Sequence, residues 1–387
     1  MPSLKDLFLL DPSVTFLNHG SFGATPKPVF REYQRWQREL ENQPVEFLGR
    51  RSTALLSEAR AGLGKYLGTH GDNLVFTQNV TISLNIVARS LGLSPDDEVL
   101  TTDHEYGAID RTWRFLSKER GFKYINQPIS MPLTTQEEFI EDFWRGVTAH
   151  TRVICLSQIT SPTAILFPLK EILQRARERG ILTIVDGAHV PGQIPLNLDA
   201  LGADFYGGNL HKWLCAPKGA GFLYARPAVQ HLLKPLVVSW GYESETPSGS
   251  DFIDYNEWWG TRDLAAFLSV PAAIEFQKEN DWDSVREACH QLVREAQNGI
   301  CELTGLAPLH APAGDWFRQM VAVPLPADTD LVRLKSRLYD EFKIEVPLVA
   351  WNGSKLIRVS VQGYNSRRDI NKLLKALSQY LPGRSKE

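Results

Sequence analysis

The sequence has little cysteine. Its four cysteines, Cys155, Cys215, Cys289 and Cys301, are scattered through 387 residues with no Cys-x-x-Cys spacing. A disulfide framework needs paired cysteines, and a structural zinc site usually needs closely spaced ones. The sequence therefore predicts neither a disulfide framework nor a metal site, and we expect the protein to act in the reducing cytoplasm.

Long apolar runs and blocks of like charge are also missing. No segment approaches the ~20 apolar residues of a membrane-spanning helix, and the opening residues MPSLKDLFLLDPSV do not resemble an export signal. The 42 basic and 45 acidic residues give a net charge of −3. We therefore expect neither a membrane nor a nucleic acid as a partner.

The dinucleotide fingerprint G-x-G-x-x-G is absent from the place where a nicotinamide enzyme needs it, between a first strand and a helix. GAG at 219–221 instead opens an apolar run, and GSFGA at 20–24 has the wrong spacing. A Rossmann dehydrogenase is therefore disfavoured, although its parallel sheet would match the pattern described next.

Short apolar runs alternate with helix-like segments through the first two thirds of the chain. Continuous hydrophobicity is typical of strands that are buried on both faces. The alternation predicts an α/β fold with a doubly wound, mainly parallel sheet. The expected strands are 74–77, 98–102, 152–157, 181–186 and 221–225, and the expected helices are 52–67, 106–120, 135–147 and 168–180.

The last third has a different pattern, which predicts a smaller α+β domain. Two long amphipathic helices are expected there, followed by two strands and a terminal helix. Because single cores stop growing near ~250–300 residues, a chain of this length is expected to divide. We predict a large domain over 21–261 and a small domain made of an N-terminal arm, 1–20, with 262–387. The expected elements are helices 262–280 and 282–304, strands 318–325 and 356–362, and a helix from about 367.

Asp186 and Lys212 carry the strongest chemical signal. Asp186 ends the apolar run ILTIVD, and ligands of parallel sheets bind at the carboxyl ends of strands. Lys212 lies 26 residues later in GGNLHKW, where apolar and cationic neighbours would lower the pKa of its amine and make it a nucleophile. Taken alone, the aspartate could be a helix cap and the lysine a solvated side chain; their combination favours a catalytic site.

These segments resemble the class V aminotransferases, which are fold type I enzymes that depend on pyridoxal 5′-phosphate (PLP). The resemblance rests on DGAH at 186–189 and GGNLHKW at 207–213. FLNHGSFGATP, EFLGRR at 46–51, TSPT at 160–163 and IRVSVQGYNS at 357–366 are similar to the isopenicillin N epimerase-like and cysteine C–S lyase-like branch. The resemblance implies the fold type I architecture, PLP, and a homodimer.

It also implies a role for each matching residue. Lys212 would hold PLP as a Schiff base, Asp186 would pair with the pyridine nitrogen, and His189 would form a hydrogen bond with the phenolic oxygen. One aromatic ring would stack on the cofactor, with Tyr106 the first choice and His104 the second. Thr261 would reach the phosphate of the neighbouring subunit. The remaining cofactor contacts would come from Asn79, Val80, Thr81, Thr160, Asn209 and His211.

Two of these assignments also have a basis in the residues themselves. TQNVTISLN at 77–85 runs from a strand into a helix, and the free N–H groups of a first helical turn bind anions. Asn79 or Thr81 could equally be a simple N-cap.

In LIRVSVQ, strand alternation places Arg358 on the polar face, where it could hold a substrate carboxylate or form a surface ion pair. The match to IRVSVQGYNS favours the substrate, which Asn18 and His19 would also contact.

The resemblance leaves the reaction open. PLP enzymes of this kind form an external aldimine and a carbanion at the substrate α-carbon, and its fate decides the product. We expect an isopenicillin N epimerase-like reaction, with cysteine or cystine C–S lysis and transamination as alternatives. A persulfide-forming desulfurase is disfavoured, because it needs a mobile cysteine and none follows Cys301. A non-catalytic binding protein is disfavoured as well, because such a protein would tolerate loss of Lys212 and the lysine is present.

Overall fold

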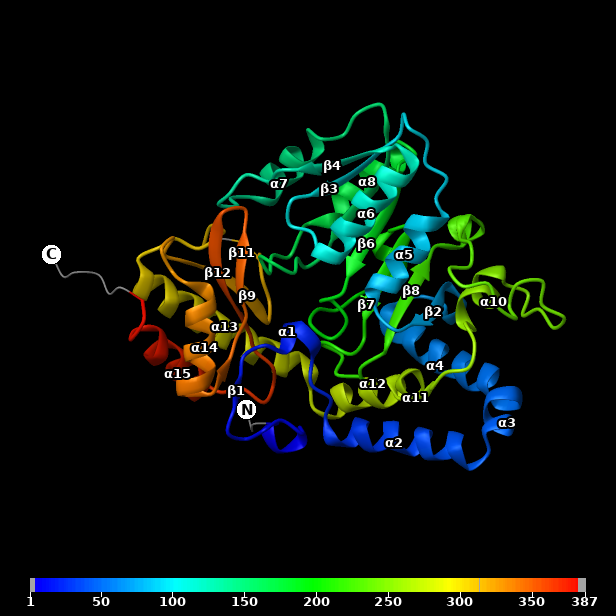
Figure 1. The fold of residues 1–387 in the computed structure, drawn as a ribbon, viewed down its shortest axis with the longest axis horizontal. Helices are drawn as coiled ribbons and strands as arrows, with labels where there is room; N and C mark the ends of the chain where they lie inside the picture. The colour runs from blue at the N-terminus through cyan, green and yellow to red at the C-terminus, as the bar shows by residue number, and fades with distance from the viewer. Residues whose placement is uncertain (1–3, 313, 382–387) are drawn as a thin grey trace.

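The computed structural model describes residues 4–312 and 314–381, and a seven-stranded sheet forms its centre (Figure 1). Neighbouring strands are parallel except at β8, which runs antiparallel to both β2 and β7. The doubly wound, mainly parallel sheet expected from the sequence is confirmed. In spatial order the strands are β2 (Leu74–Thr77), β8 (Gly221–Ala225), β7 (Phe205–Asn209), β6 (Leu182–Gly187), β5 (Thr151–Ser157), β3 (Glu98–Thr102) and β4 (Lys123–Gln127).

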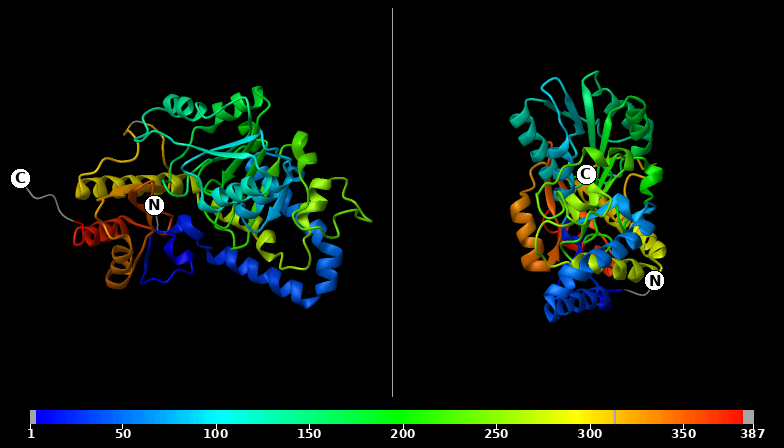
Figure 2. Two further views of the ribbon diagram at one scale, coloured as in Figure 1. Left: turned by 45° about the horizontal axis from the view of Figure 1, so that its top comes forward. Right: turned by 90° about the vertical axis from the view of Figure 1, so that its right-hand side faces the viewer.

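Helices connect these strands and pack against the sheet. α5 lies against β6, β7 and β8, and α8 lies against β6. The helices of this part are α4 (Ser52–Leu67), α5 (Val80–Ser90), α6 (Gly107–Arg120), α7 (Gln136–Trp144), α8 (Leu169–Glu178), α9 (Leu198–Leu201) and α10 (Asp251–Glu257). Both views of Figure 2 show α2 (Lys27–Asn42) along the outside of the molecule, where it precedes the short α3 (Pro44–Glu46).

The close approach of α5 to β7 depends on a glycine. A Cβ atom at Gly207 would lie 2.8 Å from Cγ2 of Val80, in the first turn of the helix. A larger residue would therefore push this turn away from the sheet. Glycine within a strand often marks such an approach, and here it sets the position of a helix N-terminus that faces the site described below.

A second, three-stranded antiparallel sheet forms the smaller part of the molecule. It consists of β11 (Leu348–Trp351), β12 (Ser354–Ser360) and β9 (Met320–Leu325), in that order. Three helices pack in this region: α13 (Trp282–Thr304), α14 (Leu331–Phe342) and α15 (Arg367–Leu377). The expected small α+β unit is therefore present, while the boundaries at 20/21 and 261/262 stay a prediction.

The N-terminal segment joins this smaller part. β1 (Thr15–Phe16) pairs in parallel with β10 (Ile344–Glu345), and α1 (His19–Phe22) follows at once. Figure 1 shows α1 between the smaller sheet and the central one. Gly23 then turns the chain with φ of +69°, and a Cβ there would lie 2.1 Å from the His211 carbonyl oxygen. The arm is thus held directly against the segment that carries Lys212.

One expected helix is interrupted. The prediction of a single helix over 262–280 was wrong: α11 (Ala265–Leu268) ends before Ser269, and α12 (Val270–Glu279) begins after it. Pro271 in the first turn of α12 explains the break, because proline has no N–H for a continuous helix. No helix in the described ranges is apolar and long enough to span a membrane.

Candidate active site

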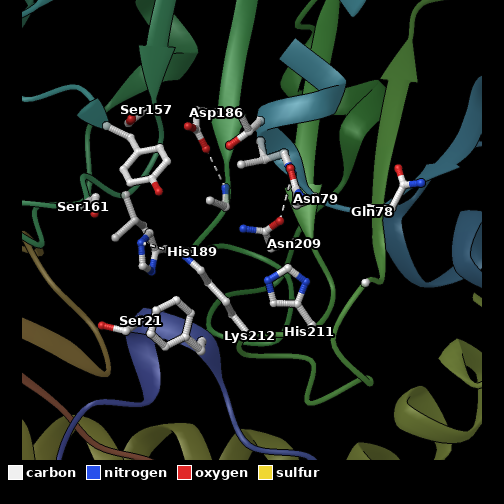
Figure 3. A pocket seen from close by; sticks show the side chains of 17 residues that line it. Ser21, Gln78, Asn79, Ser157, Ser161, Asp186, His189, Asn209, His211 and Lys212 are labelled. Carbon is white, nitrogen blue, oxygen red and sulfur yellow. Dashed lines mark hydrogen bonds between the residues drawn. The ribbon is translucent and has the colours of Figure 1, made fainter. Parts of the chain in front are cut away.

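A cavity of about 300 Å³ opens at the carboxyl ends of the central strands (Figure 3). Asp186 near the end of β6, Ser157 at the end of β5 and Asn209 at the end of β7 all line it. Parallel strands bring their carboxyl ends to one edge, so residues far apart in sequence meet there. Lys212 enters the same cavity from the loop between β7 and β8.

Lys212 has an environment that favours a neutral amine. Its Nζ atom lies 3.2 Å from Nε2 of His189. Desolvation and the charge of Arg358 lower the pKa of Lys212 to about 7, and Asp186 opposes this shift. Burial disfavours the charged ammonium form. A substantial fraction of Lys212 is therefore a nucleophile near neutral pH.

Asp186 has one satisfied and one unsatisfied carboxylate oxygen. Oδ1 accepts a hydrogen bond from the Ala188 N–H at 2.9 Å. Oδ2 is buried and has no hydrogen-bond partner in the described part of the chain. Burial raises the pKa of Asp186, although Lys212 acts in the opposite direction. A protonated pyridine nitrogen would satisfy Oδ2, so this carboxylate fits the cofactor that the resemblance implies.

The first turn of α5 faces the cavity with an unused donor. Asn79 caps the helix by accepting from the Ile82 N–H at 3.1 Å, and Asn209 Oδ1 accepts from the Val80 N–H at 2.9 Å. Within residues 4–312 and 314–381, the Thr81 N–H has no protein partner. Free N–H groups at a helix N-terminus bind phosphate well. Asn79 and Asn209 therefore organise a turn in which Thr81 is left to bind an anion.

His211 and Gln78 complete this side of the cavity. His211 Nδ1 donates to the Ala220 carbonyl at 3.0 Å, because a carbonyl can only accept. Burial lowers the pKa of His211 to about 4. Gln78, which the sequence analysis missed, has a buried Oε1 with no partner among the described residues. Its position next to Asn79 in the strand-to-helix turn was the available signal.

Arg358 does not line the cavity itself, but it contacts two residues that do, Ser161 and Ser21. Its Nη1 donates to the Ser161 carbonyl at 2.6 Å and its Nη2 to the Ser21 hydroxyl at 3.1 Å. Figure 3 shows Ser21 and Ser161 across Lys212 from Asn209 and His211. Asn18 accepts from the Ser21 hydroxyl at 2.5 Å, and so supports the arginine rather than lining the cavity. Burial lowers the pKa of Arg358 to about 10, and the guanidinium remains charged at neutral pH.

Tyr106 lines the cavity, whereas His104 and Thr160 do not. Tyr106 precedes α6 and its side chain is 41% exposed. His104 is fully buried, with Nδ1 2.7 Å from the Thr163 hydroxyl and its ring 4.4 Å from that of Trp351. Thr160 bonds the same Thr163 hydroxyl at 2.7 Å. This geometry favours Tyr106 as the stacking ring and gives no support to a cofactor contact by His104 or Thr160.

His19 lies behind Lys212, outside the cavity lining. Its Nε2 donates to the Lys212 carbonyl at 3.0 Å and its Nδ1 accepts from the Tyr364 hydroxyl at 3.0 Å. Because both ring nitrogens are used within the protein, this geometry gives no support to a substrate contact by His19, which instead bonds the backbone of Lys212. Thr261 is exposed and does not line the cavity of its own chain.

Glu105 is a buried acid that the sequence analysis did not select. Its carboxylate accepts from the N–H and the hydroxyl of Ser157, at 2.8 and 2.7 Å, and from the Thr102 hydroxyl at 2.8 Å. Its place between His104 and Tyr106 was the only local signal. The described residues contain no group of three His, Cys, Asp or Glu side chains that could hold a metal ion.

Comparison with known proteins places this site in a family. The family model described as Aminotransferase class-V matches residues 17–373. The chain is 36% identical over 383 residues to an isopenicillin N epimerase of Amycolatopsis lactamdurans, with 96% of each chain covered. It is 28% identical over 413 residues to a putative L-cysteine desulfhydrase of Oryza sativa subsp. japonica, covering 95% of this chain and 83% of that protein.

A solved structure has the same fold. It is a mutant of C-DES with glycine covalently linked to its PLP cofactor, and it superposes with a TM-score of 0.84 at 22% identity. The superposition covers 98% of this chain and all of the other. Together with the match of the family model to most of the chain, these similarities show that this protein belongs to the class V aminotransferase family and is a PLP enzyme.

Proposed function

We propose that this enzyme acts at the α-carbon of an amino acid, in the manner of an isopenicillin N epimerase. The observation that carries the proposal is the 36% identity to such an epimerase over nearly the whole of both chains. When bound, PLP supplies an electron sink that stabilises negative charge at the substrate α-carbon. The chain supplies binding, orientation and proton transfer.

Lys212 is the proposed base and Arg358 the proposed carboxylate-binding residue. Lys212 would hold PLP through Nζ, and once the substrate amine has taken its place there, the freed Nζ would move the α-proton, a role that suits an amine with a pKa of about 7. Arg358 holds the substrate carboxylate with its planar guanidinium. The cofactor phosphate is assigned to the opposite side, at Thr81, Asn209 and His211, and Asp186 pairs with the pyridine nitrogen.

Inversion of the α-carbon needs a second proton donor on the face away from Lys212. His19 and Tyr106 are the two candidates, and His19 has both ring nitrogens engaged behind the lysine. Tyr106 lines the cavity and is partly exposed to solvent. We therefore assign delivery of the second proton to the Tyr106 hydroxyl.

Cysteine C–S lysis is the second candidate reaction. It is favoured by the 28% identity to a putative L-cysteine desulfhydrase over most of this chain. A lyase needs Lys212 as base and expulsion of a thiol, and does not need Tyr106 as an acid. Transamination is the third outcome, for which the family name is the only support. Persulfide formation is disfavoured, since Cys155, Cys215 and Cys289 are buried and Cys301 lies within α13.

We also propose a cytoplasmic homodimer. The supporting observation is Thr261, which resembles a phosphate-binding residue of the family but is exposed and outside the cavity of its own chain. A partner subunit would bring a second Thr261 to the cavity. Thr261→Ala should therefore weaken PLP binding, and sedimentation at several concentrations should give the mass of a dimer. A monomer with full PLP affinity would contradict this.

Two experiments test the proposed function. The purified protein should be yellow, and borohydride should fix the chromophore to Lys212; Lys212→Ala should lose both properties. The holoenzyme should then be incubated with cysteine, cystine and a panel of L- and D-amino acids. Exchange of the α-proton with inversion selects the epimerase, and sulfide with pyruvate selects the lyase. A colourless protein that does not respond to added PLP would exclude every alternative.

A further inference from the structure

Trp213, next to the lysine, makes a contact that the proposed function does not use. Its side chain is fully buried, and its indole Nε1–H donates to Nδ1 of His189 at 3.2 Å. An indole N–H can only donate. Nδ1 of His189 must therefore be an acceptor, which means that it carries no proton.

This single contact determines the form of the His189 ring. A neutral imidazole with a bare Nδ1 carries its proton on Nε2. The imidazolium would place an N–H of His189 against the N–H of Trp213, two donors facing each other. Burial lowers the pKa of His189 well below its ordinary value, and the ionisable groups around it, Lys212, Arg358 and His19, act in the same direction. Asp186 lines the same cavity but makes no hydrogen bond to His189.

The form of His189 in turn decides the form of Lys212. His189 Nε2 lies 3.2 Å from Nζ of Lys212. Because Nε2–H is a donor, Nζ must offer a lone pair, and only the neutral amine has one; an ammonium has donors alone. Trp213 and Lys212 are adjacent in sequence, so the same short segment carries the reactive amine and the group that selects its neutral form.

We propose that Trp213 is a positioning residue, which fixes His189 as its Nε2–H tautomer and thereby holds Lys212 as the neutral amine that reacts with the cofactor aldehyde. The part that concerns the aldehyde rests on the proposed function. Once PLP is attached to Nζ, the same Nε2–H is free to donate to an oxygen in the cavity.

The tautomer can be measured without any reaction. In protein labelled with ¹⁵N-histidine, freed of PLP, long-range ¹H–¹⁵N correlations distinguish a protonated Nε2 from a protonated Nδ1, and His189→Gln identifies the His189 signal by its absence. We expect a neutral ring with the proton on Nε2 at neutral pH. A proton on Nδ1, or a charged ring, would overturn the proposal. A protein that keeps the expected tautomer but binds no PLP would refute the proposed function alone.

The effect on Lys212 is measured through the pH dependence of PLP attachment, followed by its absorbance change. Trp213→Phe removes the indole donor and should raise the apparent pKa of Lys212 by roughly 0.5–1 unit, which makes attachment about threefold to tenfold slower below that pKa. Trp282→Phe is the matched control, because it removes a buried indole donor whose partner is the Gly192 carbonyl, at 3.0 Å. Equal profiles for the two variants would contradict the proposal.

A second pair of variants covers the case in which Trp213→Phe does not fold. A glutamine at position 189 can accept from Trp213 through Oε1 and donate to Lys212 through Nε2, as the proposed tautomer does. His189→Gln should therefore keep the low apparent pKa of Lys212, and His189→Leu should raise it. Identical profiles for these two variants would show that the hydrogen-bond pattern does not control the amine.

Discussion

Ser157 is the register partner of Asp186 on adjacent parallel strands, and it donates two hydrogen bonds to Glu105. The pyridine-pairing carboxylate assigned to Asp186 thus has a second buried acid nearby: Glu105 follows β3, two strands from β6, and bonds Ser157 on the strand between them. Burial, with a further contribution from the charge of Asp186, raises the pKa of Glu105 to about 7. Glu105 is therefore partly protonated near neutral pH, and it can share the edge of the sheet with Asp186 without a full second negative charge.

Glu105→Gln should remove a pH-dependent part of the stability. The folded pKa of about 7 lies above the ordinary 4.5, so the folded state binds this proton more tightly than the unfolded state. Its contribution to the free energy of unfolding is complete below the ordinary pKa and is lost as pH rises through the folded pKa, about 3 kcal/mol in all. Urea unfolding between about pH 5 and pH 8 measures it. Glu119→Gln, at an exposed position, is the control and should match wild type. If the unfolding free energy of Glu105→Gln depended on pH as steeply as that of wild type, the raised pKa would not belong to Glu105.

Much of the fold could be predicted because buried strands have continuous apolar runs. β2, β3 and β8 have the predicted bounds, whereas β4 and β7 were not predicted. β4 is a polar edge strand, KYINQ, with little burial. β7, FYGGN, contains Gly207, which lets α5 approach, and Gly208, where a Cβ would lie 2.3 Å from the Phe222 ring. Packing therefore overrides the weak local signal of this strand.

The candidate site was predictable where the chemistry is local. Lys212, Asp186 and His189 lie in two short motifs, and the structure brings them into contact with one cavity. The partners of Arg358 were not predictable, because Ser21 and Ser161 meet it only through tertiary packing. The choice between His104 and Tyr106 depends on which way a strand-to-helix turn points its side chains, which a sequence pattern does not fix.

Arg358→Lys should raise KM for the substrate much more than it lowers kcat. Lysine keeps the charge but loses the planar pair of donors, and hydrogen bonds to charged groups contribute about 1.5–3 kcal/mol, equivalent to roughly tenfold to 150-fold in KM. Steady-state kinetics with the best amino acid from the panel provides the measurement. Arg333→Lys on α14 should match wild type. A loss of the same size in kcat, with KM unchanged, would show that Arg358 does not bind the substrate.

Binding of PLP should be accompanied by proton uptake at His211. In the cofactor-free protein burial keeps its pKa near 4, and Nδ1–H is committed to the Ala220 carbonyl. Nε2 is then a bare acceptor, and it must gain a proton to donate to a phosphate. The phosphate raises the pKa of His211, so PLP affinity should fall as pH rises, by up to about tenfold per unit.

Calorimetry in two buffers of different ionisation enthalpy counts the protons taken up. The wild type should take up about one proton more than His211→Asn, because an asparagine amide donates without titrating. Comparing the two proteins removes the protons that come from Lys212 and from PLP itself. Equal uptake by both would show that His211 does not bind the phosphate as a cation.

Tyr106→Phe should separate the two leading reactions. Phenylalanine keeps a ring that can stack on the cofactor but has no hydroxyl to deliver a proton. If Tyr106 is the second-face acid, inversion should fall by roughly 100-fold or more, while α-proton exchange with retention continues through Lys212. Deuterium exchange followed by chiral chromatography distinguishes these outcomes. Tyr339→Phe, a similarly exposed tyrosine on α14, should behave as wild type. Inversion that survives in Tyr106→Phe would show that Tyr106 is not the acid of the epimerase reaction. Undiminished production of sulfide and pyruvate from cysteine would favour the lyase, because a lyase needs no acid at that position.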